Sequence, residues 1–205
     1  QVSLAQAGRD YTVALPESMP LLKDLKLSGI RLASPALTLR HQPKLTSLFM
    51  RDVENLRQLR FEGDFNELYR IEINRAPLLQ QADIDTTMPQ LNTLMLSRCS
   101  QLQQVNHYQP RRGLLCLYLD GKALTSLAGL NRQPMPRLTV VSVMANQLRQ
   151  LAGLTTDLPN LDQLRLTHNR IRSLDDSIWQ LRSQAQVYLD HNPLSPRVID
   201  EARQV

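Results

Sequence analysis

The stretch from Leu161 to Leu174, LDQLRLTHNRIRSL, decides how this chain folds. Counting Leu161 as offset 0, apolar residues stand at offsets 0, 3, 5 and 10, and Asn169 stands at offset 8. The first half alternates apolar and polar residues, which is typical of a short strand with one buried face. The Asn169 amide can then bond backbone groups in the following turn and in neighbouring units, where unpaired polar atoms cost about 1–3 kcal/mol each. The stretch therefore predicts one strand followed by one buried turn.

The same pattern recurs along most of the chain. Offset 0 falls on Leu22, Leu45, Leu68, Leu91, Leu114, Leu138, Leu161 and Gln184, at spacings of 23 or 24 residues. Offsets 0, 3 and 5 comprise 24 positions in these repeats, and 23 of them are Leu, Ile, Val or Met; Gln184 is the exception. A pattern that keeps its phase over this length indicates a solenoid of stacked repeats.

The spacing L-x-x-L-x-L-x-x-N-x-L is that of leucine-rich repeats. We predict an α/β solenoid, a leucine-rich-repeat horseshoe of about nine 23-residue repeats. Its concave face is expected to be a parallel β-sheet, and its convex face to hold short helices, turns and extended pieces. Residues 1–205 are expected to form one domain, with a truncated first repeat (1–21), eight repeats (22–194) and a C-terminal exit helix (195–205). Because Val2 and Leu4 already fall on offsets 3 and 5, we expect the natural chain to continue upstream of Gln1.

The turn position at offset 8 divides the repeats into two types. It holds Ile30, Val53, Ala76 and Cys99 in the first half, and Asn146, Asn169 and Asn192 in the second. We interpret Cys99 and the three asparagines as a structural ladder that is buried in the turns. Lys122 occupies this position in the Leu114 repeat and cannot bond the turn in the same way, so we predict that this junction is loose or differently built.

The exposed face of the strands offers a surface for a partner. Nine parallel strands at about 4.8 Å span roughly 38 Å, which is enough for a protein. Aromatic, Met and Arg side chains, which protein interfaces favour, gather on four strands. The predicted partner-binding residues are Phe49, Arg51, Tyr69, Arg70, Arg75, Met95, Arg98 and Tyr118. The alternative is that this face is simply solvated and that arginine is common throughout the chain.

Composition and motifs exclude several classes of function. A formal charge of +5 over so long a surface gives no reason to expect a nucleic-acid partner, and no apolar run is long enough to span a membrane. Cys99 and Cys116 are not placed for a disulfide, and no Ser, His, Asp or Cys constellation suggests catalysis. His168 and His191 share offset 7 in adjacent repeats beside Asp190, a set that can hold zinc, although exposed turn residues are the commoner explanation. We therefore predict no catalytic residue, metal or cofactor in this fragment.

The C-terminal segment carries a more specific resemblance. Residues 187–197, VYLDHNPLSPR, are similar to the last repeat and exit segment of bacterial secreted effectors that carry a novel-type E3 ubiquitin ligase domain. In that family the repeats recognise substrate and a following helical domain holds a catalytic Cys-x-Asp motif. Neither Cys99 nor Cys116 stands in such a motif, so no catalytic residue carries over. The repeats here also run at 23 residues, longer than is common in those effectors.

The resemblance implies a substrate-recognition domain of a larger bacterial effector, with a host protein as partner and a catalytic domain after Val205. Its implied location is inside a host cell after secretion, and otherwise the bacterial cytoplasm. The alternative is a stand-alone bacterial scaffold or adhesion protein with no attached enzyme.

Overall fold

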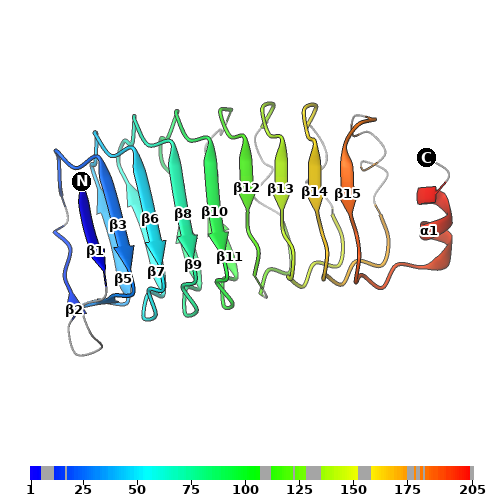
Figure 1. The fold of residues 1–205 in the computed structure, drawn as a ribbon, viewed down its shortest axis with the longest axis horizontal. Coiled ribbons are helices and arrows are strands. Elements are labelled where there is room, and N and C mark those ends of the chain that lie inside the picture. The colour runs from blue at the N-terminus through cyan, green and yellow to red at the C-terminus, as the bar shows by residue number, and fades with distance from the viewer. Residues whose placement is uncertain are drawn as a thin grey trace.

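The computed structural model describes residues 1–5, 12–16, 18–106, 112–121, 123–127, 135–151, 158–174, 178, 181 and 183–203. Lys122, on which the prediction about the junction depends, lies outside these residues. The chain winds into a stack of turns, each of which contributes one strand to a single continuous sheet (Figure 1).

We call this nine-stranded sheet the front sheet, and all of its strands run parallel. Its strands are, in spatial order, β1 (Val2–Ala5), β3 (Asp24–Ser28), β6 (Ser47–Arg51), β8 (Arg70–Asn74), β10 (Thr93–Ser97), β12 (Cys116–Tyr118), β13 (Val140–Ser142), β14 (Gln163–Arg165) and β15 (Gln186–Tyr188). Neighbouring strands pair residues that are 23 apart, or 24 apart between β12 and β13, where the sequence carries one extra residue. The repeat period therefore sets the strand register directly.

The leucine positions form the core of the stack. The apolar residues at offsets 0, 3 and 5 point inward, and between Leu25 and Leu166 they are at most 1% exposed. Parallel strands place equivalent side chains directly above one another, so each turn buries its apolar residues against the turns on either side. The Gln184 repeat is the exception, because Gln184 is exposed and its Val187 and Leu189 are only partly buried.

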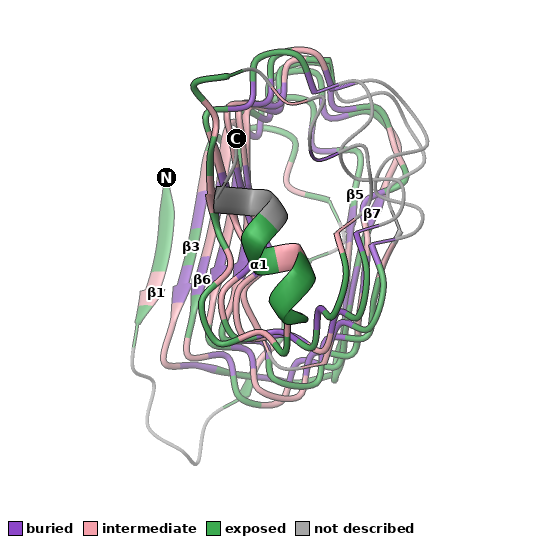
Figure 2. Ribbon diagram, turned by 90° about the vertical axis from the view of Figure 1, so that its right-hand side faces the viewer, coloured by how far each residue is buried: buried purple, intermediate pink, exposed green. Residues whose placement is uncertain are grey.

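A second parallel sheet covers the opposite side of the first half of the stack. This back sheet consists of β5 (Ala36–Arg40), β7 (Gln58–Glu62), β9 (Gln81–Asp83) and β11 (Gln104–Asn106), and a separate pair joins β2 (Thr12–Val13) to β4 (Arg31–Leu32). The sequence predicted extended pieces here among helices and turns, but not their pairing into a sheet. Hydrogen-bonded strands on both sides give the front and back of each turn the same spacing, about 4.8 Å. In the view along the axis, β5 and β7 lie nearly one behind the other, whereas β1, β3 and β6 are displaced stepwise (Figure 2).

The described part of the second half has no back-sheet strand and ends in one helix, α1 (Pro196–Arg203). Ser195 precedes it, and its hydroxyl oxygen accepts a hydrogen bond from the Val198 N–H at 3.4 Å, as an N-cap does. The helix lies across the C-terminal end of the stack (Figure 2). Among the described residues, no helix combines the length and hydropathy required to cross a membrane.

Candidate functional site

The exposed face of the front sheet carries a single file of side chains in strand register. Lys26, Phe49, Glu72, Met95 and Tyr118 are paired from β3 to β12, one residue per strand. Phe49, Met95 and Tyr118 are each partly exposed, and the Lys26 ammonium lies 5.2 Å from the centre of the Phe49 ring. At this distance the ammonium is attracted to the ring face. Three apolar members of the predicted patch are therefore brought into one row, interrupted by the Glu72 carboxylate.

Three of the four patch arginines are held by carboxylates. Arg70 Nη2 lies 2.8 Å from Glu72 Oε2, and its Nε donates to the same oxygen at 3.0 Å. At the other end of the strands, Asp52 lies 3.4 Å from Arg75 Nε and 3.7 Å from Arg51 Nε. Arg98 makes no ion pair with any described residue.

Sequence reasoning missed both Glu72 and Asp52 as site residues. Glu72 stands two residues after Arg70, which places the two side chains on the same face of β8. The sequence spacing therefore already indicated that the two side chains could form an ion pair. Asp52 follows Arg51 directly, and only the stacking of turns brings it to Arg75. The patch is therefore not simply basic, since it presents both signs of charge around an apolar row.

Arg75 and Arg98 occupy an unusual backbone position. Their φ angles are 68° and 55°, in the left-handed region, and the equivalent residues Asp52, His168 and His191 share it. The backbone pairing nevertheless continues through this point, because the Arg75 N–H donates to Ser97 O at 2.9 Å and the Arg98 N–H to Asp120 O at 3.0 Å. We call this side of the stack, where the front strands end, the lower edge; it lies at the bottom of Figure 1.

The structure thus divides the predicted patch into three parts. Phe49, Met95 and Tyr118 form the central row, Tyr69 and Arg70 lie where β8 begins, and Arg51, Arg75 and Arg98 lie at the lower edge. Tyr69 is 44% exposed, one of the few large apolar side chains to protrude so far.

The central row ends at Tyr118, because the next position is buried. Ser142 is 0% exposed, and its hydroxyl donates to Asp120 Oδ1 at 2.7 Å. The same carboxylate oxygen accepts the Met144 N–H at 2.8 Å. Ser142 pairs with Tyr118 and so stands in the same file as the row, but it is buried and bound by the Asp120 side chain from the preceding turn.

The asparagine ladder lies in the turns of the second half. The Asn169 amide donates to Val143 O and Leu166 O, both at 2.9 Å, and its oxygen accepts the Leu148 N–H at 3.0 Å. Asn146 and Asn192 make the equivalent bonds one turn before and one turn after. Each amide therefore joins its own turn to the previous one.

Cys99 occupies the same position in the first half. It is 1% exposed, and burial raises the pKa of its thiol to about 11. The thiol lies 3.5 Å from Ser97 O, the residue two before it. Because a neutral thiol bonds weakly, this turn is held by packing rather than by a side-chain ladder.

Comparison with known proteins agrees with this architecture. Residues 136–194 match the protein family described as Leucine rich repeat. The fold is a parallel-stranded solenoid, and residues 136–194 of it carry the leucine-rich-repeat pattern. Among solved structures, an internalin from Listeria monocytogenes is similar at 15% identity and a TM-score of 0.41, covering 78% of this chain. A leucine-rich-repeat protein from Leptospira interrogans is similar at 15% identity and a TM-score of 0.33, covering 80% of this chain and 71% of its own. This chain spans 58% of the length of the internalin. No curated protein matches this chain.

The leucine-rich-repeat pattern of residues 136–194 is one that suits a protein-interaction scaffold. The two histidines considered as zinc ligands stack face to face, with ring centres 4.1 Å apart and planes 12° apart. Within the described residues, no group of three or more His, Cys, Asp or Glu side chains is arranged for a metal ion.

Proposed function

We propose that the solenoid recognises a protein partner on its front face, centred on the row of Phe49, Met95 and Tyr118. The observation that carries this proposal is the register of the row, which places three large apolar side chains on one exposed surface. Partly exposed aromatic and Met residues beside arginines have the composition of binding hot spots.

The surrounding charges define what the partner must offer. Arg70 and the Asp52 cluster are already ion-paired, so their side chains are held in place before binding. Less side-chain entropy is then lost when a partner docks. Glu72 lies within the row and is already paired with Arg70, so the partner is expected to offer apolar side chains to Phe49 and Tyr118.

We further propose that this scaffold is the substrate-recognition domain of a larger bacterial effector of the E3 ubiquitin ligase type, secreted into a host cell where it binds a host protein. The support is the similarity of residues 187–197 to the exit segment of those effectors, and the catalytic domain would follow Val205. The alternative is a stand-alone bacterial scaffold or adhesion protein with no attached enzyme, which would be cytoplasmic if it is not secreted.

Photocrosslinking followed by affinity measurement tests the front-face proposal. A photoreactive amino acid at position 95 is used to capture and identify the partner, and binding of the purified partner is then measured by calorimetry. Phe49→Ala and Tyr118→Ala should each weaken binding about tenfold or more, as hot-spot truncations do. Tyr188→Ala is the matched control, because Tyr188 lies in the same file on β15 and is 40% exposed, but stands outside the patch.

Two outcomes would reject the patch. One is an equal loss of affinity in the Tyr188→Ala control, and the other is full binding by a variant with charge reversal at Arg70, Arg75 and Arg98. The ligase context needs a separate test, in which the parent reading frame is sequenced and its product is assayed for self-ubiquitination. A cysteine-dependent ubiquitin ladder supports the effector, whereas a stop codon soon after Val205 without a ladder supports the stand-alone scaffold.

A further inference from the structure

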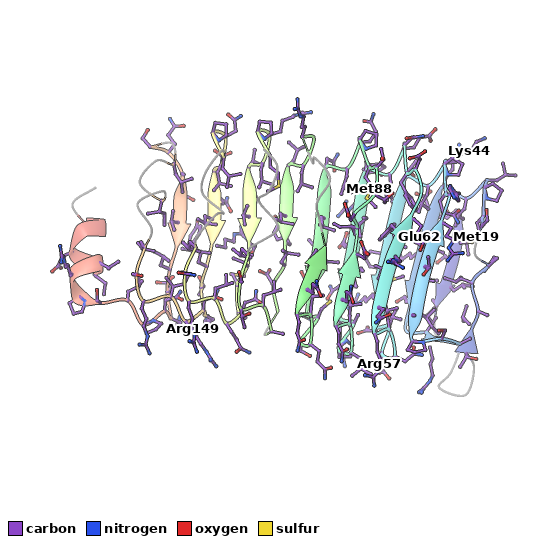
Figure 3. The ribbon with its side chains drawn as sticks, turned by 180° about the vertical axis from the view of Figure 1, so that it is seen from behind. Met19, Lys44, Arg57, Glu62, Met88 and Arg149 are labelled. Atoms are coloured by element: carbon purple, nitrogen blue, oxygen red, sulfur yellow. The ribbon has the colours of Figure 1, made fainter. Side chains whose placement is uncertain are left out.

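Three arginines gather on the lower edge in the second half of the solenoid. Arg149, Arg170 and Arg172 are all exposed and come from two consecutive turns. Arg149 and Arg172 occupy the same position in those turns, 23 residues apart, so their backbones lie about 5 Å from each other. The Arg170 N–H donates to Leu148 O at 2.8 Å, which brings it beside Arg149. Figure 3 shows Arg149 at this edge.

These arginines differ from Arg40, Arg60 and Arg70 on the sheet faces in having no carboxylate partner among the described residues. Arg40, Arg60 and Arg70 each lie within 3.6 Å of a Glu or Asp oxygen. Arg149, Arg170 and Arg172 make no ion pair with any residue that the structure describes. Three like charges this close lie within one Debye length of each other, so their positive potentials add.

The start of α1 adds to the same positive field. The Ser195 N–H donates to Arg172 O at 3.4 Å, so the helix begins directly beside Arg172. The first turn of α1 contains no acidic residue to offset the positive end of the helix dipole. Guanidinium groups and a helix N-terminus both favour carboxylates and phosphates.

We propose that this edge, defined by Arg149, Arg170 and Arg172, docks an acidic segment of a protein, rich in Asp or Glu. A protein segment is favoured over nucleic acid because residues 135–174 contain no Phe, Tyr or Trp on which bases would stack. It is favoured over a membrane because none of the exposed large apolar residues falls in the described parts of those turns. These three arginines belong to the turns of β13 and β14, beyond the row of Phe49, Met95 and Tyr118 on β6 to β12, so either proposal can fail without the other.

Fluorescence anisotropy with three probes tests this proposal. The probes are a fluorescein-labelled oligo-glutamate peptide, a labelled single-stranded DNA and phosphatidylserine vesicles. A variant with Arg149→Glu, Arg170→Glu and Arg172→Glu should bind the peptide about tenfold or more weakly than the natural chain, since exposed ion pairs contribute modestly each. A second variant with all three arginines changed to Gln should lose less affinity for the peptide than the triple Glu variant does. Added salt should weaken binding of the peptide by the natural chain.

A matched control variant changes the net charge by the same amount, but on another part of the surface. Lys23→Glu, Lys44→Glu and Arg137→Glu substitute exposed residues that precede front-sheet strands, on the opposite edge, where Figure 3 shows Lys44. This control should keep peptide affinity within about threefold, as expected for exposed charges outside the contact. An equal loss in both variants would mean that only net charge matters, and the proposal would be wrong. Failure of the peptide to bind the natural chain, or tighter binding of DNA or vesicles that depends on the same arginines, would also overturn it.

Discussion

Replacement of Asn169 by Ala offers a quantitative test of how the second half is held together. Asn169 is 6% exposed, and its amide serves three backbone groups, the N–H of Leu148 and the carbonyls of Val143 and Leu166. Both carbonyls keep a second partner in the variant, since Val143 O also accepts from Asn146 at 3.0 Å and Leu166 O from Asn192 at 2.9 Å. The Leu148 N–H is therefore the group that is left unsatisfied.

The expected loss of stability follows from this geometry. An unsatisfied buried N–H costs about 1–3 kcal/mol, and each lost bond to a carbonyl that keeps another partner costs about 0.5 kcal/mol. Asn169→Ala should thus lower the free energy of unfolding by roughly 2–4 kcal/mol. Asn192→Ala removes the same kinds of bond, but Asn192 is only half-buried and water can replace its amide. We expect Asn192→Ala to lower the free energy of unfolding by about half as much as Asn169→Ala does.

Urea denaturation followed by circular dichroism measures both variants, and amide hydrogen exchange locates the damage. Exchange at Leu148 should accelerate in Asn169→Ala, whereas exchange at Leu48 in the first half should not, because repeat stability is the sum of local terms. A loss for Asn169→Ala no larger than that for Asn192→Ala, or unchanged protection of Leu148, would refute the ladder as the source of stability.

Three other predictions concern the first half. Leu94→Ala, at a site that is 0% exposed, should cost about 2–5 kcal/mol in urea denaturation, and a cost under about 1 kcal/mol would show that the core relaxes. Gly63 has a φ of 85°, and a Cβ there would lie 2.5 Å from His41 Nδ1. Gly63→Ala should therefore lower the free energy of unfolding by about 1–3 kcal/mol. In a double-mutant cycle, His41→Ala should restore part of this loss. The raised pKa keeps the Cys99 thiol protonated at pH 8. Titration with a thiol reagent should therefore detect Cys116 alone in the folded protein and both cysteines in urea. Rapid labelling of Cys99 in the folded protein would contradict its burial.

The pairing of strands illustrates which features were predictable. A period of 23 residues is enough to place Phe49, Met95 and Tyr118 in one file, because parallel strands pair equivalent residues. The back sheet was not predicted, although Leu37-Thr38-Leu39 and Leu59-Arg60-Phe61 alternate as strands do. Whether such segments pair depends on the path of each turn, and here Ala36 pairs with Gln58, a shift of 22 residues.

The side-chain partners show a second limit. Arg70 was predicted as a contact residue for a partner, yet its guanidinium is bound to Glu72 of its own strand. Ser142 stands in the same file as the exposed residues of the row, yet it is buried and its hydroxyl is bonded to Asp120. A periodic pattern assigns each residue to a face, but it does not say which polar neighbour a long side chain reaches, because that choice depends on rotamers and on the detailed stacking of the turns.

The sequence by itself determined the solenoid, its strand register, its leucine core and the position of its asparagine ladder, because each follows from a repeat whose period must match the backbone geometry. Only the tertiary structure decided the back sheet along the first half, the contact between Asp52 and Arg75, and the cluster of arginines beside α1. These features arise between turns, where groups distant in the chain are brought within a few ångströms by the stacking itself.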